Sequence, residues 1–345
     1  MLGYSQIEKR IDYMTLYRKL YLASILIAFL VLSVFTASLM AQSALNYPTR
    51  AVRIIVPYAP AGVNDIVARI VAQRLTEKWG QTVVVENRPG AAGNIGTALV
   101  AKSAPDGYTL LMGSTSNLSM NVSLYEKLPF DPVRDFAPIG LVTTSPQVIL
   151  VRPALGVSTL AELVALAKGK PGSLNYSTYG NGSLAHLTTE LLKSAAGINM
   201  VQVPYNGGGP ALTAVVAGEV DLTIVPISVS LAQIKAGTVR PLAVVSNKRF
   251  SGLPDVPTVA ESGVPGFEAD SWVALLAPAG TPPAIVRKIS EDVASIMLAP
   301  DSRKFLEEKG MVSVGSSPEK LSVFLKLEIE RWDKVAKASG VKAEL

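Results

Sequence analysis

The hydrophobic pattern of residues 52–79 predicts a strand, a short loop and a helix in succession. The run VRIIV (Val52–Val56) is apolar and β-branched, which is typical of a buried strand. Beyond it, apolar residues recur at the spacing of one helix face, at Ile66, Val67, Ile70, Val71 and Leu75. Two prolines and a glycine in the intervening PYAPAGVND end the strand, and Asn64 or Asp65 is expected to cap the helix. The free N–H groups of the first turn then face the loop, where they suit a carboxylate or phosphate.

Strand and helix patterns alternate through the next part of the chain. TVVVE (82–86) and YTLLMG (108–113) are strand-like, and a helical pattern at 92–101 lies between them. This alternation predicts a parallel sheet covered by helices, with its functional edge at the carboxyl ends of the strands. The glycine-rich NRPGAAGNIG (87–96) fits a packing turn as well as a ligand contact, because it lacks the full GxGxxG spacing.

Hydroxyl and amide side chains follow the strand at 108–113 directly. The segment GSTSN places Ser114, Ser116 and Asn117 at a carboxyl end. These side chains are neutral donors, so we expect them to contact a carboxylate.

The second half of the chain repeats the same alternation. The apolar run at 148–151 marks the first crossing into a second lobe, where LNYSTYGNGSLAHL carries a strand into a glycine-serine turn (180–183) and an amphipathic helix. Further strands are expected at 201–205, 221–227 and 241–246, and helices from the capping pattern at 159–162 and at 211–217, 228–236, 284–298 and 318–338. The expected lobes are residues 46–147 with 272–345, and residues 148–271.

Two strand-loop-helix elements with small-residue turns, one in each lobe, are able to face each other across a cleft. Helix N-termini from both sides would then hold one anion, and closure about a hinge is the expected motion.

The N-terminal segment has the pattern of a secretory signal. Residues 20–40 are apolar apart from a few Ser and Thr, follow Arg18 and Lys19, and precede small residues. We expect residues 1–43 to be a signal peptide cut after Ser43, which exports the protein to the periplasm. The alternative is an uncleaved anchor in the inner membrane, since about 20 apolar residues span a bilayer. Met14, just before TLYRKL, is an alternative start of translation.

Composition narrows the chemistry. The 345 residues are 49% hydrophobic and include one histidine and no cysteine, which leaves no thiolate nucleophile, disulfide framework or multi-histidine metal centre. A formal charge of +5 without an arginine-rich stripe does not favour nucleic acid. No GxxxxGK[ST] motif occurs, so no nucleotide cofactor is expected.

From Tyr47-Pro48 onward, several motifs occur in the order typical of one family. They are IIVPYAPAGVND, VENRPGAAGNIG, SAPDGYTLLMG, HLTTELLKSAAGI, VPYNGGGPALTAVVAGEVD and LPDVPTVAESGVPGFE, followed by SW and APAGTPP. With them, residues 46–345 resemble the Bug, or tripartite-tricarboxylate-transporter, periplasmic solute-binding receptors. The resemblance implies an α/β type II periplasmic-binding-protein fold with two Rossmann-like lobes and a ligand cleft between them. It also implies capture of a small carboxylic acid for membrane permease subunits, with no cofactor, by what we expect to be a monomer.

The resemblance extends to individual residues of the first loop. The family pattern PFxxGGxxD is matched by Pro57, Tyr58, Gly62 and Asp65. Ala61 stands where the first glycine is expected, and its methyl group changes the backbone freedom or narrows the pocket. We expect the ligand-binding part of this loop to be Tyr58, Pro60, Ala61, Gly62, Asn64 and Asp65.

Four other places carry the resemblance. Ser114 and Ser116 are similar to the family's hydroxyl-bearing loop, and Asp221 to an aspartate near the cleft. The second-lobe turns resemble GxGSxxHL and PYxGxxP, and their matching residues are Gly182, Ser183 and His186 in the first, and Tyr205, Gly207 and Gly208 in the second.

Several of these residues have structural interpretations beside the functional ones. His186 alone is more typical of a satisfied structural histidine, and it need not touch ligand. Asp65 is interpreted as orienting the loop, because no partner nucleophile is evident. Tyr58 either closes over the ligand or packs at the lobe edge. Asp221 fits a solvated loop or a helix cap as well as a cleft position.

Three functional hypotheses follow. The leading one is a receptor that binds a mono- or dicarboxylate, including an aromatic one, through main-chain N–H groups, hydroxyls and water, without covalent chemistry. An exported hydrolase would need a nucleophile and a base, and the nearest approach to G-x-S-x-G, GNGSL, lacks the last glycine. The third is a receptor that signals to a membrane sensor, which the sequence does not separate from transport.

Overall fold

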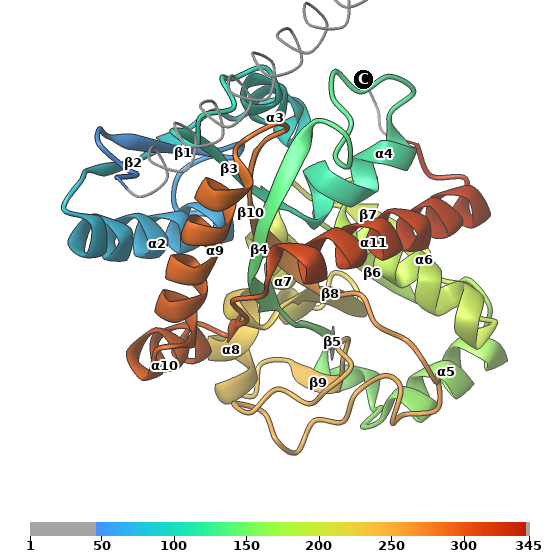
Figure 1. The fold of residues 1–345 in the computed structure, drawn as a ribbon. Coiled ribbons are helices and arrows are strands. Elements are labelled where there is room, and N and C mark those ends of the chain that lie inside the picture. Colours follow the sequence, from blue (N-terminus) through green and yellow to red (C-terminus); the bar gives the residue numbers. More distant parts are fainter. Residues whose placement is uncertain (1–45, 343–345) are drawn as a thin grey trace, which may run out of the picture. The chain divides into compact units, whose positions relative to one another are not determined.

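The computed structural model describes residues 46–342, and its compact unit runs over Arg50–Leu345 (Figure 1). The expected signal peptide lies outside the described residues. Residues 46–49 form neither a helix nor a strand. Among the helices of residues 46–342, none combines the length and the apolar content needed to cross a membrane.

The unit contains a six-stranded and a five-stranded sheet, each covered by helices. In spatial order, the first sheet contains β11 (Val312–Ser313), β4 (Phe136–Ser145), β10 (Ser271–Pro278), β3 (Thr109–Ser114), β1 (Val52–Val56) and β2 (Val83–Asn87). Its three N-terminal strands are parallel, whereas β10 runs antiparallel to both β3 and β4. The predicted mixed α/β class is confirmed.

Opposite faces of the first sheet pack against different helices. Leu141 and Trp272 share an apolar cluster with Leu321 and Leu325 of α11 (Pro318–Ser339). On the other face, a Cβ added at Gly140 would lie 4.0 Å from Ser290 Oγ of α9 (Pro283–Leu298). The remaining helices of this part are α2 (Val63–Trp79), α3 (Asn94–Ala101), α4 (Asn121–Leu124) and α10 (Pro300–Glu308).

The second sheet has the spatial order β7 (Val201–Pro204), β6 (Asn175–Thr178), β8 (Leu222–Pro226), β5 (Gln147–Val151) and β9 (Arg240–Val244). Strand β6 is parallel to β7 and β8, whereas β5 is antiparallel to β8 and β9. Its helices are α5 (Leu160–Gly169), α6 (Leu184–Ala196), α7 (Gly208–Ala217) and α8 (Ile227–Lys235). As expected, α5 begins at a cap, where Thr159 Oγ1 accepts from Glu162 N at 3.2 Å.

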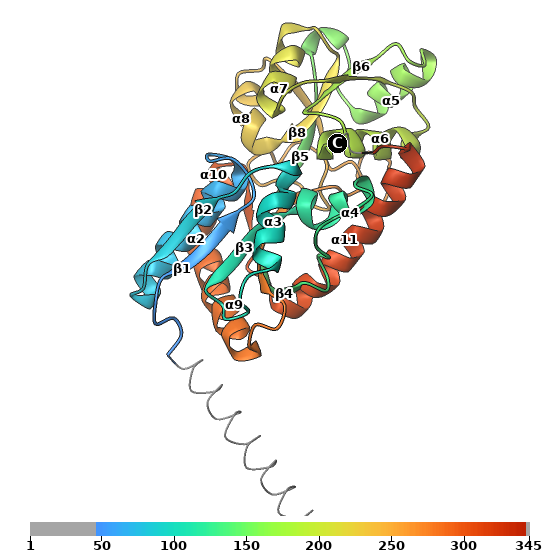
Figure 2. The same ribbon diagram turned by 90° about the horizontal axis from the view of Figure 1, so that it is seen from above.

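Two chain crossings and one helix join the sheets (Figure 2). Strand β4 continues through Pro146 into β5, and residues 245–270 lead from β9 back to β10. Helix α11 begins on the first sheet and ends against α6, where Trp332 and Val335 enter the core of the second sheet.

Strand directions decide which loops meet at this junction. Because β10 is antiparallel to β3 and β4, strand β3 runs in the same direction as the crossing strand β4, and β1 and β2 follow it. Gln147, at the start of β5, pairs with Pro226 at the end of β8. The carboxyl ends of β1, β2 and β3, and those of β6, β7 and β8, therefore all lie toward the junction between the sheets.

Helices α3 and α10 are two of the elements at which the structure differs from the sequence pattern. Helix α3 begins at Asn94, two residues later than expected, because Ala91, Ala92 and Gly93 have positive φ angles. Helix α10 was not predicted, since PDSRKFLEE has few apolar residues to mark a buried face.

Candidate functional site

The first turn of α2 presents main-chain donors that the protein does not use. The helix begins at Val63 behind the N-cap Gly62, and no side chain caps it. The expectation that Asn64 or Asp65 caps the helix is therefore wrong. Its first backbone bond runs from Ile66 N to Gly62 O at 3.0 Å. Within residues 46–342, the N–H groups of Gly62, Val63 and Asn64 have no hydrogen-bond acceptor.

Asp65 does not cap the helix, and its side chain instead stabilises the loop that precedes it. Its buried carboxylate accepts from Ala61 N at 3.0 Å, from Arg69 Nε at 2.9 Å and from Asn87 Nδ2 at 3.0 Å. Hydrogen bonding to Arg69 is the main cause that lowers the pKa of Asp65, so the carboxylate stays ionised. Both its oxygens are engaged, which makes Asp65 a positioning residue for the loop.

Ala61 adopts a backbone conformation that usually belongs to glycine. Its φ angle is +67°, in the left-handed region, and the residue is exposed. For a residue with a Cβ atom this conformation costs about 1 kcal/mol. The bond from Ala61 N to Asp65 offsets part of that cost. The same torsion explains why a glycine is expected at this position.

The end of β3 is tied to the same loop through Tyr58. The Tyr58 hydroxyl donates to Asn117 Oδ1 at 2.9 Å and lies 2.9 Å from Ser114 Oγ. Asn117 is fully buried, accepts from Ser114 N at 2.8 Å and donates to Thr97 Oγ1 at 2.7 Å. The expectation that Asn117 contacts ligand is corrected, because its amide is enclosed and satisfied. Burial raises the pKa of Tyr58 to about 12, so its phenol remains a neutral donor.

The N-terminus of α6 is built differently. The Ser183 side chain caps it by accepting from His186 N at 3.3 Å, and Gly182 N donates to His186 Nδ1 at 3.2 Å. An accepting Nδ1 requires the proton on Nε2, so the ring is neutral. Burial is the main cause that lowers the pKa of His186, which keeps it neutral at physiological pH. The interpretation of His186 as a structural histidine agrees with this geometry.

The start of α7 resembles that of α2. Gly207 is its N-cap, with a φ angle of +119° and no side-chain cap. Gly208 N and Gly209 N have no acceptor in the described chain, and a Cβ added at Gly209 would meet nothing within 4 Å. Tyr205 is half-buried, and its hydroxyl is turned toward Glu219 Oε2 at 3.3 Å.

Asp221 lies at the opposite end of the second sheet. It immediately precedes β8, so it is far along the strand from the carboxyl end at Pro226. Its carboxylate accepts from Arg152 Nε at 2.9 Å and from Asn175 N at 2.9 Å. The expectation that Asp221 lies near the cleft is corrected, because this ion pair fastens the amino end of the strand.

The remaining predicted residues lie at carboxyl ends of the parallel strands. Pro60, Ala61 and Gly62 are exposed in the loop after β1, and Ser116 is half-buried after β3. Gly182 and Ser183 follow β6, and Gly207 follows β7. The topology thus gathers these residues at the junction of the sheets. None of them is Lys or Arg, so positive potential comes from helix N-termini.

Two residues of this site were not predicted from the sequence. Arg69 and Asn87 complete the shell around Asp65. The contact between Arg69 and Asp65 was predictable from the sequence, because an acidic and a basic residue four positions apart on a helix lie side by side. Asn87 had none, since only the parallel register of β1 and β2 brings it to Val56.

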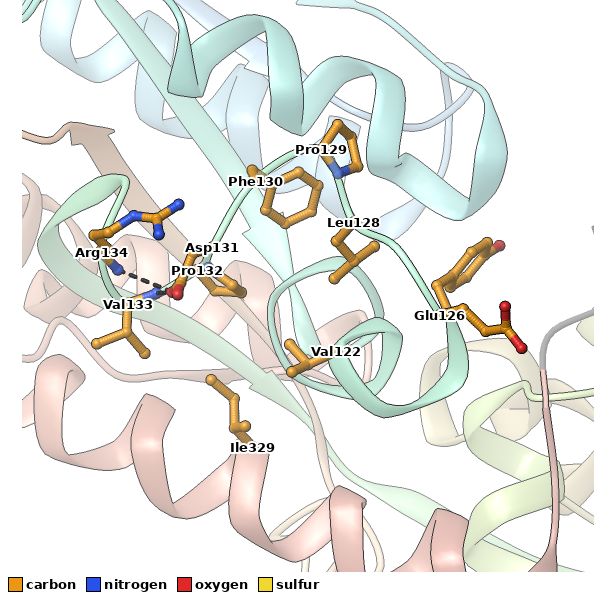
Figure 3. Close-up of a pocket in the computed structure, with 11 residues that line it drawn as sticks. Val122, Glu126, Leu128, Pro129, Phe130, Asp131, Pro132, Val133, Arg134 and Ile329 are labelled. Atoms are coloured by element: carbon orange, nitrogen blue, oxygen red, sulfur yellow. Dashed lines mark hydrogen bonds between the residues drawn. The ribbon is translucent and has the colours of Figure 1, made fainter.

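A separate hollow of about 640 Å³ lies between the segment after α4 and helix α11 (Figure 3). It contains none of the predicted contact residues. Asp131 Oδ1 accepts from Val133 N and Arg134 N at 2.8 and 3.0 Å, and the Arg134 side chain binds Asp135 at 2.8 Å. Asp131 and Arg134 are therefore already engaged within their own turn.

Two sheets joined by crossing strands, with uncharged donors gathered where the strands end, define the class of solute-binding receptors. The chain belongs to the tripartite tricarboxylate transporter family receptors, whose family model matches residues 67–341. Proteins of this family are periplasmic solute-binding receptors and not enzymes.

Individual relatives are similar in sequence to this chain over most of its length. Protein BugT of Bordetella pertussis is 38% identical over 321 residues, which are 92% of this chain and 98% of BugT. The solved structure of R. palustris Rpa4515 with adipate is 38% identical with a TM-score of 0.76, covering 86% of this chain and 99% of that one. MatC (Rpa3494) from Rhodopseudomonas palustris with bound malate is 33% identical with a TM-score of 0.71, covering 84% and 99%.

Proposed function

We propose that this receptor binds a small mono- or dicarboxylate at the junction of its two sheets and delivers it to the permease subunits of a tripartite transporter. The observation that carries the proposal is the uncapped first turn of α2, where three main-chain N–H groups have no acceptor in the described chain. A helix N-terminus of this kind favours an anion. The adipate and malate in the two similar structures support the ligand class.

The residues of the site are of two kinds, those that contact the carboxylate directly and those that hold the contacting loops in place. The direct contacts are the N–H groups of the α2 and α7 starts and the hydroxyls of Ser116 and Ser183. The Ser183 hydroxyl accepts from His186 N, so its own hydrogen is free to donate to a carboxylate. Asp65, Tyr58, Asn117 and His186 shape the loops that present these donors.

Hinge closure about the crossings completes the proposed mechanism. The lobes are residues 46–147 with 272–345, and residues 148–271, a division supported by the two sheets and by the crossing at Pro146. Closure brings the α6 and α7 starts toward the α2 start and removes water from the carboxylate, which strengthens its hydrogen bonds.

The proposal includes the place of action. The protein is exported by a signal peptide at 1–43 and acts in the periplasm as a monomer. Mass spectrometry of the protein purified from the periplasm tests this. The measured mass should equal that of a chain that begins at Ala44. Protein that keeps residues 1–43 and is found in the membrane fraction would indicate an anchor.

Calorimetry tests binding directly. The exported chain is unfolded and refolded to remove retained ligand, its fold is checked by circular dichroism, and it is titrated with aliphatic and aromatic mono- and dicarboxylates. At least one acid should bind saturably at one site. Folded protein that binds none of them would contradict the proposed function.

Delivery to a transporter needs a cellular test. A strain that lacks the receptor gene should lose uptake of the acid that the purified receptor binds, and plasmid-borne receptor should restore it. Unchanged uptake combined with a lost transcriptional response to the acid would indicate the signalling receptor instead.

A further inference from the structure

The crossing strand carries a row of buried polar atoms that the described chain does not satisfy. Thr143 Oγ1, Ser145 Oγ and Gln147 Oε1 have no hydrogen-bond partner among residues 46–342. The three residues are 0%, 2% and 0% exposed. They alternate along one extended segment, at the end of β4 and the start of β5. Buried polar side chains are nearly always hydrogen-bonded, so three unpartnered ones in a row call for an explanation.

Strand register places two of them on the same sheet face as Ser114. Val273 of β10 pairs with Thr143 on one side and with Ser114 on the other, and Ser271 pairs with Ser145. Directly paired residues of antiparallel strands point to the same face. Thr143 and Ser145 therefore share the face of Ser114, whose hydroxyl lies against Tyr58.

The opposite face of the sheet packs against α11. Trp272 points to that face and donates from Nε1 to Glu328 Oε2 of α11 at 2.8 Å. The unpartnered atoms of Thr143 and Ser145 thus lie on the opposite face, the one that packs against α9.

Helix α8 brings the second sheet to the same place. Ile227 N, in its first turn, donates to Pro146 O at 3.0 Å, between Ser145 and Gln147. The next residue, Ser228, has a buried Oγ that is also unpartnered in the described chain. Ser228 therefore adds an unpartnered hydroxyl beside the crossing from β4 to β5.

The unpartnered atoms of Thr143, Ser145 and Gln147 indicate which kind of ligand group would complete their hydrogen bonds. Gln147 Nε2 already donates to Ser145 O at 3.4 Å, which leaves Oε1 as an acceptor that needs a donor. A carboxylate has no proton to donate. A hydroxyl donates to Gln147 Oε1 while it accepts from a Ser or Thr hydroxyl, so it matches both kinds of partner.

We propose that Thr143, Ser145 and Gln147 form the inner wall of the ligand site and select carboxylic acids that carry a hydroxyl group. This inference rests on the proposed function, because it assigns one end of the ligand to the row and the carboxylate end to the α2 start. Main-chain donors recognise the acid, and the wall discriminates among acids of equal length. A site with buried polar groups rejects an analogue that leaves them unpaired.

Matched acid pairs test the selection. Refolded receptor is titrated with succinate and malate, and with adipate and 3-hydroxyadipate, as wild type and as Gln147→Leu. In at least one pair the hydroxylated acid should bind more tightly by about tenfold, as expected for a polar group left unpaired by the plain acid. In Gln147→Leu that advantage should fall to within about twofold.

Control variants separate selection from folding. Thr223→Val removes a buried hydroxyl that donates to Ser177 O within the second sheet, and it should leave the preference intact. If Gln147→Leu does not fold by circular dichroism, Ser145→Ala is measured with the same pairs and should reduce the preference. Equal affinities within every pair, or an unchanged preference in the folded variants, would overturn this inference and leave the proposed function standing. Absence of binding by all four acids and by the wider panel would overturn the proposed function.

Discussion

The starts of α2 and α6 are built from similar sequence, yet they treat their main-chain donors in opposite ways. Both follow a parallel strand and a turn that contains glycine. At α6, Ser183 caps the helix and His186 accepts from Gly182 N. At α2, Gly62 supplies no side chain, and the first N–H groups have no acceptor in the described chain.

This difference shows how a helix start is kept open for a ligand. A Ser cap is worth about 1 kcal/mol relative to an apolar residue, whereas Gly62 leaves the donors unpaired. The α2 loop is ordered instead by Asp65, whose carboxylate accepts from Ala61 N. One helix start is therefore stabilised internally, and the other is left open to bind an anion.

The two starts also differ in charge. Asp65 is ionised and paired with Arg69, whereas His186 is neutral. The order of the α2 loop thus depends on an ion pair, and that of the α6 turn on one uncharged hydrogen bond. The α2 loop and the α6 turn can therefore be perturbed separately, the first by substitution of Asp65 and the second by protonation of His186.

Removal of Asp65 should have the largest effect. Asp65→Ala removes a buried acceptor that Ala61 N, Arg69 and Asn87 share, so the free energy of unfolding in urea should fall by about 2–4 kcal/mol. Carboxylate affinity should fall with it, because the loop is no longer held.

Asp221→Ala is the matched control for Asp65→Ala. It removes a carboxylate that binds Arg152 and Asn175 at the far end of the second sheet. Stability should fall by a similar amount, but affinity should stay the same. Equal affinities for both variants would contradict the positioning role of Asp65.

Of the two helix starts, only the α6 turn should be affected by acidification from pH 7 to pH 5. The folded pKa of His186 lies below 6.5, so its contribution to stability is present above pH 6.5 and is lost as pH falls through the folded pKa. The loss should be about 1 kcal/mol, the worth of the Gly182–His186 bond. Asp65 has a lowered pKa, so it keeps its contribution until pH falls below its usual value of 3.8.

His186 is the single histidine of the chain, which makes the measurement simple. Nitrogen NMR of ¹⁵N-labelled histidine should show one titration with a midpoint below 6.5 and the proton on Nε2 in the neutral form. A midpoint at or above 6.5, or a proton on Nδ1, would exclude the proposed bond from Gly182 N.

Substitution of Ala61 should have the smallest effect. Ala61→Gly relieves about 1 kcal/mol of left-handed strain and loses about 0.4–1 kcal/mol through the freer unfolded chain, so stability should rise by no more than about 0.6 kcal/mol. Ala59 has no positive φ, and Ala59→Gly should cost about 0.4–1 kcal/mol. Urea denaturation compares the two, and equal losses would show that Ala61 is unstrained.

Strands and long helices were predictable because burial imposes a period on the sequence. β1 has the predicted bounds, since four of its five residues have no exposed surface on a sheet covered on both faces. The site was predictable only as a set of loops at carboxyl ends. Which of their residues face the ligand depends on partners that are distant in sequence.

Three residues show this limit. Asn117 looks like a ligand donor until Thr97 and Tyr58 are placed around it. Asp221 looks like a cleft residue until the direction of β8 is known. The row at Thr143 becomes visible only through the register of β4 and β10. Local patterns carry no information about these pairings.

The central claim is that open main-chain donors at the start of α2 hold the carboxylate, and Val63→Pro tests it most directly. Proline is tolerated at the first position of a helix, where it removes one N–H group, and Gly62 already has the extended conformation, φ −77° and ψ 170°, that precedes proline. Val63→Ala keeps the N–H group and serves as the control. The carboxylate affinity of Val63→Pro should be at least about tenfold below that of Val63→Ala, with similar urea midpoints. Equal carboxylate affinities for the two folded variants would contradict the account.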